Sequence, residues 1–284
     1  MKVFVINLKK SPERLEAMKK QLDKLDIPFE IFTAVDGGSL EPEYLHKTFL
    51  ASQVTRGRFG EKRGVGEIGC ATSHFNIYKT IVEQNTELSL ILEDDIKLTD
   101  DFLKVYHFIE ANKKKVFSKF DYIQLGFCTH EGNWVTESRQ SRWRNIKIDQ
   151  QLIIAPPAAF YWSAIGYFVT NRGAKILFEL GNPVRMVSDY LLAVAPKYGL
   201  RSGILNHPVI QTSEHNESSN IEHTSLHAPI DKLKRYQNSP SANTIKKFSK
   251  IRLYYFIRNR FPGIHRFIGK YVYEKWFLIE HGFK

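Results

Sequence analysis

Ser89-Leu90-Ile91-Leu92-Glu93-Asp94-Asp95 joins a continuous apolar run to three consecutive acidic residues. A short apolar run of this kind is typical of a strand that is buried on both faces. In open α/β sheets, functional side chains lie at the carboxyl ends of such strands. Three adjacent carboxylates repel one another and are costly unless a cation lies among them. The stretch therefore predicts an α/β sheet with a cation site at one strand end.

The acidic residues themselves suggest which cation this would be. Side chains alternate faces along a strand, so Glu93 and Asp95 are expected on one side and Asp94 on the other. Carboxylate pairs suit Mg²⁺ or Mn²⁺, hard cations that keep water ligands and bridge to phosphate oxygens. Such a cation neutralises a leaving diphosphate. The alternative is a solvated acidic turn that caps the helix expected after Thr99.

Strand-like and helix-like runs alternate on both sides of this stretch. Strands are predicted over residues 2–8, 29–35, 88–92, 121–125, 165–170 and 201–205. Helices are predicted over residues 12–26, 67–84, from 100 onwards, 171–180 and 188–198, with loops over 39–66 and 126–150. This order predicts an α/β fold with a mainly parallel sheet flanked by helices.

The net charge divides the 284-residue chain into two parts. Residues 232–284 hold 13 of the 41 Lys and Arg but only 2 of the 30 Asp and Glu, so the surplus of +11 lies there and residues 1–231 are formally neutral. A linker is expected near residues 238–243, which read NSPSAN. We expect no signal peptide and no membrane span of roughly 18 apolar residues. Cys70 and Cys128 are expected as free thiols.

Basic and aromatic residues alternate through residues 232–284. This mixture favours docking on an anionic membrane surface. The alternative is a small basic helical appendage that packs its aromatic side chains on the rest of the chain. A nucleic-acid-binding protein would also be basic, but it would not explain the acidic strand end or residues 66–74. We therefore expect no nucleic-acid partner.

A series of short motifs, in order, resembles glycosyltransferase family 25, the bacterial lipooligosaccharide galactosyltransferases and related enzymes. The motifs are VINL at 5–8 with Ser11 and Arg14, AVDG at 34–37, GEIGCATSH at 66–74 with Tyr78, LEDD at 92–95, Gly166-Tyr167 through Gly173-Ala174, and Pro183 through Asp189. They span about residues 3–220, and residues 66–74 match most specifically.

The resemblance implies a GT-A type fold, in which a nucleotide-sugar lies across a Rossmann-like sheet. Residues 1–231 would form the catalytic domain, with a nucleotide-sugar half at about 1–125 and an acceptor half at about 126–231. The implied reaction is inverting transfer of galactose from UDP-galactose, with Mn²⁺ or Mg²⁺, to a sugar of lipooligosaccharide or lipopolysaccharide in a β-linkage. Another UDP-sugar, glucose or N-acetylhexosamine, is the alternative donor. A lipid-linked acceptor implies a cytoplasmic enzyme, peripheral on the inner membrane.

Inversion needs one base that faces the leaving group across the reacting carbon. Asp189, at the start of the helix over 188–198, is the candidate base, with Glu93 and Asp94 as rivals. Capping of that helix by Ser188 and Asp189 is the structural alternative.

The remaining candidates are assigned to the donor and to the metal. Glycines near a helix start let a ligand approach the backbone closely, which favours ligand contacts from Ser73 and His74. The candidates for donor binding are Asn7, Arg14, Asp36, Ser73, His74 and Asp94. The candidate metal ligands are Glu93, Asp95, Gln211 and His215.

Overall fold

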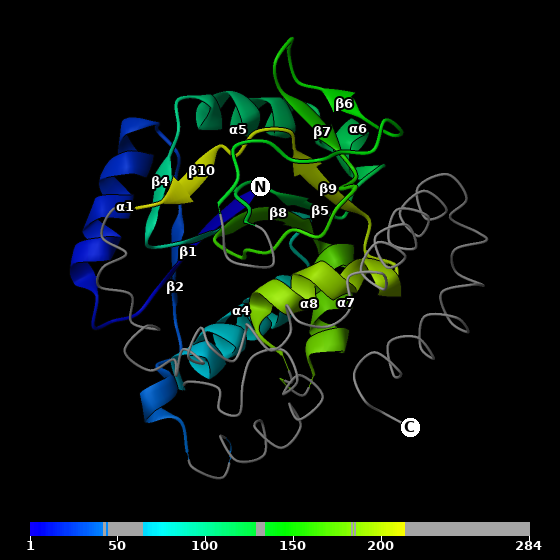
Figure 1. Cartoon of the computed structure of the whole chain (residues 1–284). Coiled ribbons are helices and arrows are strands. Elements are labelled where there is room, and N and C mark those ends of the chain that lie inside the picture. Colours follow the sequence, from blue (N-terminus) through cyan, green and yellow to red (C-terminus); the bar gives the residue numbers. More distant parts are fainter. Residues whose placement is uncertain (42–43, 45–64, 129–133, 183, 185, 214–284) are drawn as a thin grey trace, which may run out of the picture.

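The computed structural model describes residues 1–41, 44, 65–128, 134–182, 184 and 186–213 (Figure 1). At its centre lies an eight-stranded sheet with the order β2-β1-β3-β8-β5-β9-β7-β6. The strands are β1 (Lys2–Asn7), β2 (Glu30–Thr33), β3 (Leu88–Glu93), β5 (Tyr122–Gln124), β6 (Ile146–Lys147), β7 (Ile153–Ala155), β8 (Gly166–Thr170) and β9 (Ser202–Leu205). A second, two-stranded sheet pairs β4 (Ile96–Leu98) with β10 (Ile210–Thr212).

The strand directions confirm a mixed, mostly parallel sheet. Strands β1, β2 and β3 are mutually parallel, and β5 is parallel to β9. Strand β8 lies antiparallel between β3 and β5, and β7 is antiparallel to both β9 and β6. The expected mainly parallel, Rossmann-like sheet is therefore confirmed.

The helices fall where the apolar periodicity predicts them, with corrections at their ends. They are α1 (Pro12–Lys24), α4 (Val65–Glu83), α5 (Asp101–Ala111), α6 (Lys113–Phe117), α7 (Asn171–Gly181) and α8 (Ser188–Val194), with 3₁₀ turns η1 (Gly37–Ser39) and η3 (Ala195–Tyr198). The predicted helix over 188–198 thus changes to a 3₁₀ turn after Val194, where Pro196 lacks the amide hydrogen that an α-helix needs. Thr170 caps α7, because its Oγ1 accepts a hydrogen bond from the Gly173 backbone amide at 3.0 Å.

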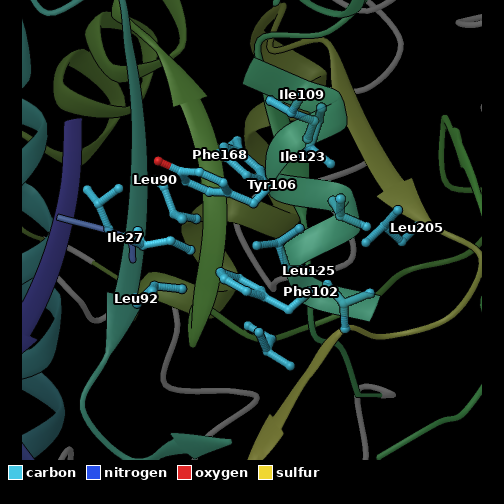
Figure 2. Packing of buried hydrophobic residues seen from close by; sticks show 14 of the residues in the cluster. Ile27, Leu90, Leu92, Phe102, Tyr106, Ile109, Ile123, Leu125, Phe168 and Leu205 are labelled. Carbon is cyan, nitrogen blue, oxygen red and sulfur yellow. The ribbon is translucent and has the colours of Figure 1, made fainter. Parts of the chain in front are cut away.

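The two faces of the sheet explain why β3 has apolar side chains on both of its faces. Leu90 and Leu92 point to the face covered by α1, α5 and α6, where they pack with Phe102 and Tyr106 (Figure 2). Ile91 points to the opposite face, which α4, α7 and α8 cover. Because side chains alternate along a strand, Glu93 follows Ile91 onto the α4 face.

Several expectations need correction or lie outside the described residues. Strands β4, β6, β7 and β10 were not predicted, and β6 lies within the loop expected over 126–150. Most of the loop expected over 39–66 and all of residues 232–284 lie outside the described residues, as does the proposed domain boundary. In the part of the chain that the structure describes, no helix combines the length and apolarity required to cross a bilayer.

Gly69 allows α4 to pass close to the end of β2. A Cβ at Gly69 would lie 2.6 Å from the Gly37 nitrogen and 2.6 Å from the Val35 oxygen, both backbone atoms. We expect Gly69→Ala to lower the free energy of unfolding by about 1–3 kcal/mol, as overpacking usually does. Urea denaturation measures this, with Gly38→Ala as the control, because its added Cβ would find its nearest neighbour at 3.5 Å. Equal stability of the two variants would contradict the close packing.

Asp121 anchors the opposite end of the sheet. Its fully buried carboxylate pairs with Arg201, at 2.6 Å, and with Arg172. Burial alone would raise the pKa of Asp121, but hydrogen bonds from the two guanidinium groups hold it below its usual 3.8. This carboxylate therefore stabilises the fold above pH 3.8, and its contribution is lost as the pH falls through the lowered pKa.

We expect Asp121→Asn to lower the free energy of unfolding by about 1.5–3 kcal/mol at neutral pH, the range for hydrogen bonds to charged groups. Denaturation from pH 7 to pH 2 should show the difference from wild type shrinking below about pH 4. The control is Asp101→Asn, whose half-exposed carboxylate pairs only with Lys104 among the described residues. A difference that stays constant down to pH 2 would exclude this ion pair as its source.

Candidate active site

The acidic cluster lies where β3 ends and the chain turns into β4. Glu93 is the last residue of β3, and Asp94 and Asp95 form the turn. The side-chain amide of Asn7 donates a hydrogen bond from Nδ2 to Asp94 Oδ2 at 2.6 Å. Arg14 Nη1 lies 3.6 Å from Asp94 Oδ1 and 3.3 Å from Asp95 Oδ2. Because β1 is parallel to β3, the end of β1 and the start of α1 bring Asn7 and Arg14 to the carboxylates.

The side chain of Glu93 contacts helix α4. Its Oε1 lies 3.1 Å from His74 Nε2 and 4.0 Å from Cys70 Sγ. His74 Nδ1 lies 2.8 Å from the Tyr167 hydroxyl, which lies 2.7 Å from the Tyr78 hydroxyl. The structure thus differs from simple strand alternation, because Asp94 and Asp95 lie in a turn and share Arg14, while Glu93 contacts α4.

Burial and mutual repulsion raise the pKa values of these acids. The pKa of Glu93 rises to about 8 through burial and the charges of Asp95 and Asp94. Burial also raises the pKa of Asp94 to about 6, and that of Asp95 above its usual value. Ionising this cluster therefore costs free energy that a nearby cation would offset.

The cluster also offers a carboxylate oxygen that is free to bind a metal, as far as the described residues show. Asp95 Oδ1 is buried and has no hydrogen-bond partner among the described residues. Buried carboxylate oxygens are normally hydrogen-bonded or bound to metal. Together with the neighbouring carboxylates, this oxygen fits a hard divalent cation such as Mg²⁺ or Mn²⁺.

Asp189, on α8, is close enough to the acidic cluster for the charge of Glu93 to change its pKa. It lies in the first turn of that helix, close enough to the Ala164 backbone amide for that amide to lower its pKa. Burial and the charge of Glu93 raise its pKa to about 7, against the lowering effects of His74 and Ala164. A carboxylate with a pKa near neutrality is well matched to general base catalysis.

The other predicted site residues lie in different surroundings. Asp36 is bound to Lys10 at 2.9 Å and caps η1 by accepting from the Gly38 amide. Ser73 Oγ is buried, accepts from the Val35 amide at 2.8 Å and donates to the Gly69 carbonyl at 2.7 Å. Its observed contacts therefore connect α4 to the end of β2.

Of the two candidate metal ligands near the end of the catalytic region, only Gln211 lies within the described residues. Gln211 is an exposed residue of β10 opposite Lys97. The Ser213 amide, two residues further, donates to the Asp95 carbonyl at 2.9 Å, so the end of β10 reaches the acidic turn. His215 lies outside the described residues.

Sequence reasoning gave no role to Cys70 and singled out Tyr167 only within a motif. The spacing of four residues between Cys70 and His74 was an available signal, because it places both side chains on one face of a helix. The contact of Tyr167 with His74 joins β8 to α4, residues 93 positions apart. No local pattern of the sequence indicates such a contact.

The family model described as "Glycosyltransferase family 25 (LPS biosynthesis protein)" matches residues 1–192, which include the acidic cluster, the α4 residues and Asp189. The chain belongs to glycosyltransferase family 25. A glycosyltransferase 25 family member of Drosophila melanogaster is 36% identical over 176 residues, covering 61% of this chain and 27% of the relative. Procollagen galactosyltransferase 1-B of Xenopus laevis is 29% identical over 219 residues, covering 75% and 32%.

Human procollagen galactosyltransferase 2 is 24% identical over 233 residues, covering 78% of this family 25 chain and 33% of the relative. The chain thus spans about a third of the length of these curated relatives. Among solved structures, a glycosyltransferase involved in the glycosylation of the major capsid of PBCV-1 is similar with a TM-score of 0.32 and 13% identity. That similarity covers 72% of this chain and 81% of the other.

Proposed function

We propose that this family 25 chain is a metal-dependent, inverting glycosyltransferase that moves galactose from UDP-galactose to a sugar of lipooligosaccharide or lipopolysaccharide, in a β-linkage. The observation that carries the proposal is the acidic cluster, with its raised pKa values and the unpartnered Asp95 Oδ1. The names of the procollagen galactosyltransferases support galactose as the sugar. The family description, which names lipopolysaccharide biosynthesis, supports the acceptor.

In the proposed reaction each residue has a role that its contacts support. Glu93 and Asp95, with Asp94 beside them, would hold Mn²⁺ or Mg²⁺, which supplies positive charge against the leaving diphosphate. Asn7 fixes the orientation of Asp94 through its hydrogen bond. Arg14 balances part of the negative charge at the turn. Asp189 would accept the proton of the attacking acceptor hydroxyl.

Transfer assays with a panel of donors test the proposed reaction. Purified protein with Mn²⁺ is given UDP-galactose, UDP-glucose or UDP-N-acetylglucosamine, together with truncated lipooligosaccharide, and the products are analysed by mass spectrometry. We expect galactose transfer to exceed the others, and NMR of the product to show a β-linkage. Preferred transfer of another sugar would reject the donor, and full activity in excess EDTA would reject the metal.

The acceptor has its own test, because the relatives are named for procollagen. A procollagen peptide is offered beside the lipooligosaccharide under identical conditions. Transfer to the oligosaccharide alone supports the proposal. Transfer to the peptide alone would replace the proposed acceptor with a protein.

Peripheral binding to the cytoplasmic face of the inner membrane is also part of the proposal, and it rests on the charge of residues 232–284. An anionic surface attracts each nearby Lys or Arg by about 1 kcal/mol within a Debye length of roughly 10 Å. We therefore expect joint replacement of Lys246, Lys247, Lys250 and Arg252 by Gln to release the protein from anionic vesicles. Transfer to a soluble acceptor should remain unchanged.

Co-sedimentation with anionic and neutral vesicles, at low and high salt, measures this binding. The wild type should prefer anionic vesicles and lose that preference as salt rises. Equal sedimentation with both vesicle types would reject membrane docking and favour a structural appendage. Preferential binding to single- or double-stranded nucleic acid would instead favour a nucleic-acid-binding protein.

A further inference from the structure

A second set of potential metal ligands lies beside the acidic cluster, on the α4 side of the sheet. The ligand atoms of Cys70, His74 and Glu93 all lie within 4.8 Å of one another. Two of these side chains converge on a single atom, Glu93 Oε1, with His74 Nε2 at 3.1 Å and Cys70 Sγ at 4.0 Å. Thiol, imidazole and carboxylate groups gathered in this way resemble the ligand sets of protein zinc sites.

The elements that hold the three ligands belong to the packed core, a helix and an interior strand of the sheet. Cys70 and His74 are four residues apart on α4, so they share one face of the helix. Glu93 is fixed at the end of β3, which pairs with β1 on one side and β8 on the other. His74 is 1% exposed, whereas the Glu93 side chain retains 23% exposure. The ligands are therefore held in place by the core, with access from the side of Glu93.

The surroundings of His74 leave the correct nitrogen facing the other ligands. Its Nδ1 lies 2.8 Å from the Tyr167 hydroxyl, and that hydroxyl is bound in turn to Tyr78 at 2.7 Å. Metal-binding histidines almost always have such a partner on the second ring nitrogen, which fixes the ring and the tautomer.

We propose that Cys70, His74 and Glu93 form a Zn²⁺ site, chemically distinct from the hard-cation cluster at Asp94 and Asp95. Thiolate and imidazole ligands favour Zn²⁺ over Mg²⁺ and Mn²⁺, and the general order of affinities also places Zn²⁺ above Mn²⁺. Three protein ligands leave the fourth position of a tetrahedral ion open to water or to a ligand. The inference does not depend on the proposed sugar transfer, and Glu93 is the residue that the two metal assignments share.

Binding requires the Cys70 thiol to lose its proton. Zn²⁺ would form a bond to the sulfur as the S–H bond breaks, and the proton would pass to the buffer. We expect the affinity to rise with pH and calorimetry to detect proton release on binding.

Cobalt titration of the full chain tests the site without any substrate. Co²⁺ replaces Zn²⁺ in such sites, and a bound thiolate gives a charge-transfer absorption in the near ultraviolet. We expect this absorption in the wild type, its loss on addition of Zn²⁺, and its absence in Cys70→Ser. Cys128→Ser is the matched control and should keep the absorption, because Cys128 Sγ contacts the Trp162 carbonyl at 3.7 Å and takes no part in the cluster.

Two further variants separate this site from the acidic turn. Asp95→Ala should leave the cobalt absorption intact, and its loss there would overturn a distinct site. Tyr167→Phe removes the partner of His74 Nδ1 and should weaken Zn²⁺ binding by about 10- to 100-fold, the usual effect of losing such a partner. Unchanged affinity in Tyr167→Phe would contradict the assigned orientation of His74.

A measurement on the unmodified protein guards against a variant that fails to fold. X-ray absorption of the wild type loaded with one equivalent of Zn²⁺ should show a sulfur neighbour at about 2.3 Å together with nitrogen or oxygen neighbours. A zinc shell without sulfur, or no wild-type cobalt–thiolate absorption, would overturn the proposal.

Discussion

Asp95→Ala should abolish sugar transfer while leaving the fold intact. Asp95 supplies the buried, unpartnered Oδ1 of the acidic cluster, and its charge acts on Glu93 more strongly than that of Asp94. Removing it takes away the oxygen that best fits a hard cation. Without the cation the leaving diphosphate loses the charge that would stabilise it. Initial rates with saturating UDP-galactose and Mn²⁺ measure the effect.

Thermal unfolding separates this loss from misfolding. Burial raises the pKa of Asp95, so its ionised form destabilises the metal-free fold at neutral pH. Metal-free Asp95→Ala should therefore melt at the wild-type temperature or above it. In the wild type, Mn²⁺ with UDP should raise the melting temperature, and in the variant it should not.

The control is Asp100→Ala, five residues along the chain. Asp100 is exposed, and its side chain makes no capping hydrogen bond. Its replacement should change neither transfer nor the response to Mn²⁺ and UDP. Wild-type activity of Asp95→Ala would remove Asp95 from the metal site, whereas an equal loss in both variants would point to a general effect of charge.

The core of the fold and the place of the site could be predicted from the sequence because both are encoded locally. Residues 90–92 are apolar without alternation, as expected for a strand that is covered on both faces. The acids follow immediately, so their position at a strand end was also readable. Strands β4 and β10 were missed because they form a separate sheet with each other, across more than 100 positions of the chain, and no local pattern indicates that pairing.

The arrangement within the site could not be predicted, because it depends on contacts between distant segments. Arg14 and Asp95 are 81 positions apart, yet their side chains meet at 3.3 Å. Alternation along β3 placed Asp95 with Glu93, but the strand ends at Glu93 and the turn directs Asp95 toward Arg14. Ser73 lies in the expected motif, but its hydroxyl binds backbone groups of residues 35 and 69.

Asp189→Asn should lower turnover by on the order of 10²–10⁴, the usual contribution of a general base. The structure supports this role because burial and the charge of Glu93 raise the pKa of Asp189 to about 7. A base must be deprotonated to act, so the turnover of the wild type should fall as the pH drops below about 7. The asparagine variant has no such group, and its residual turnover should lack that dependence.

Measuring the affinity of Asp189→Asn for UDP shows whether the variant has lost only the catalytic base or has also lost donor binding. Asp189 lies in the first turn of α8, and asparagine has almost the same size and shape, so Asp189→Asn removes the charge with little change in packing. The UDP dissociation constant of Asp189→Asn with Mn²⁺ should therefore stay close to that of the wild type while turnover collapses. If turnover instead stays within a few-fold of wild type, Asp189 caps α8 or contacts the substrate, and the base must be sought at Glu93 or Asp94. Of these two, Glu93 has the higher pKa, about 8, so the activity would then be lost over a correspondingly higher pH range.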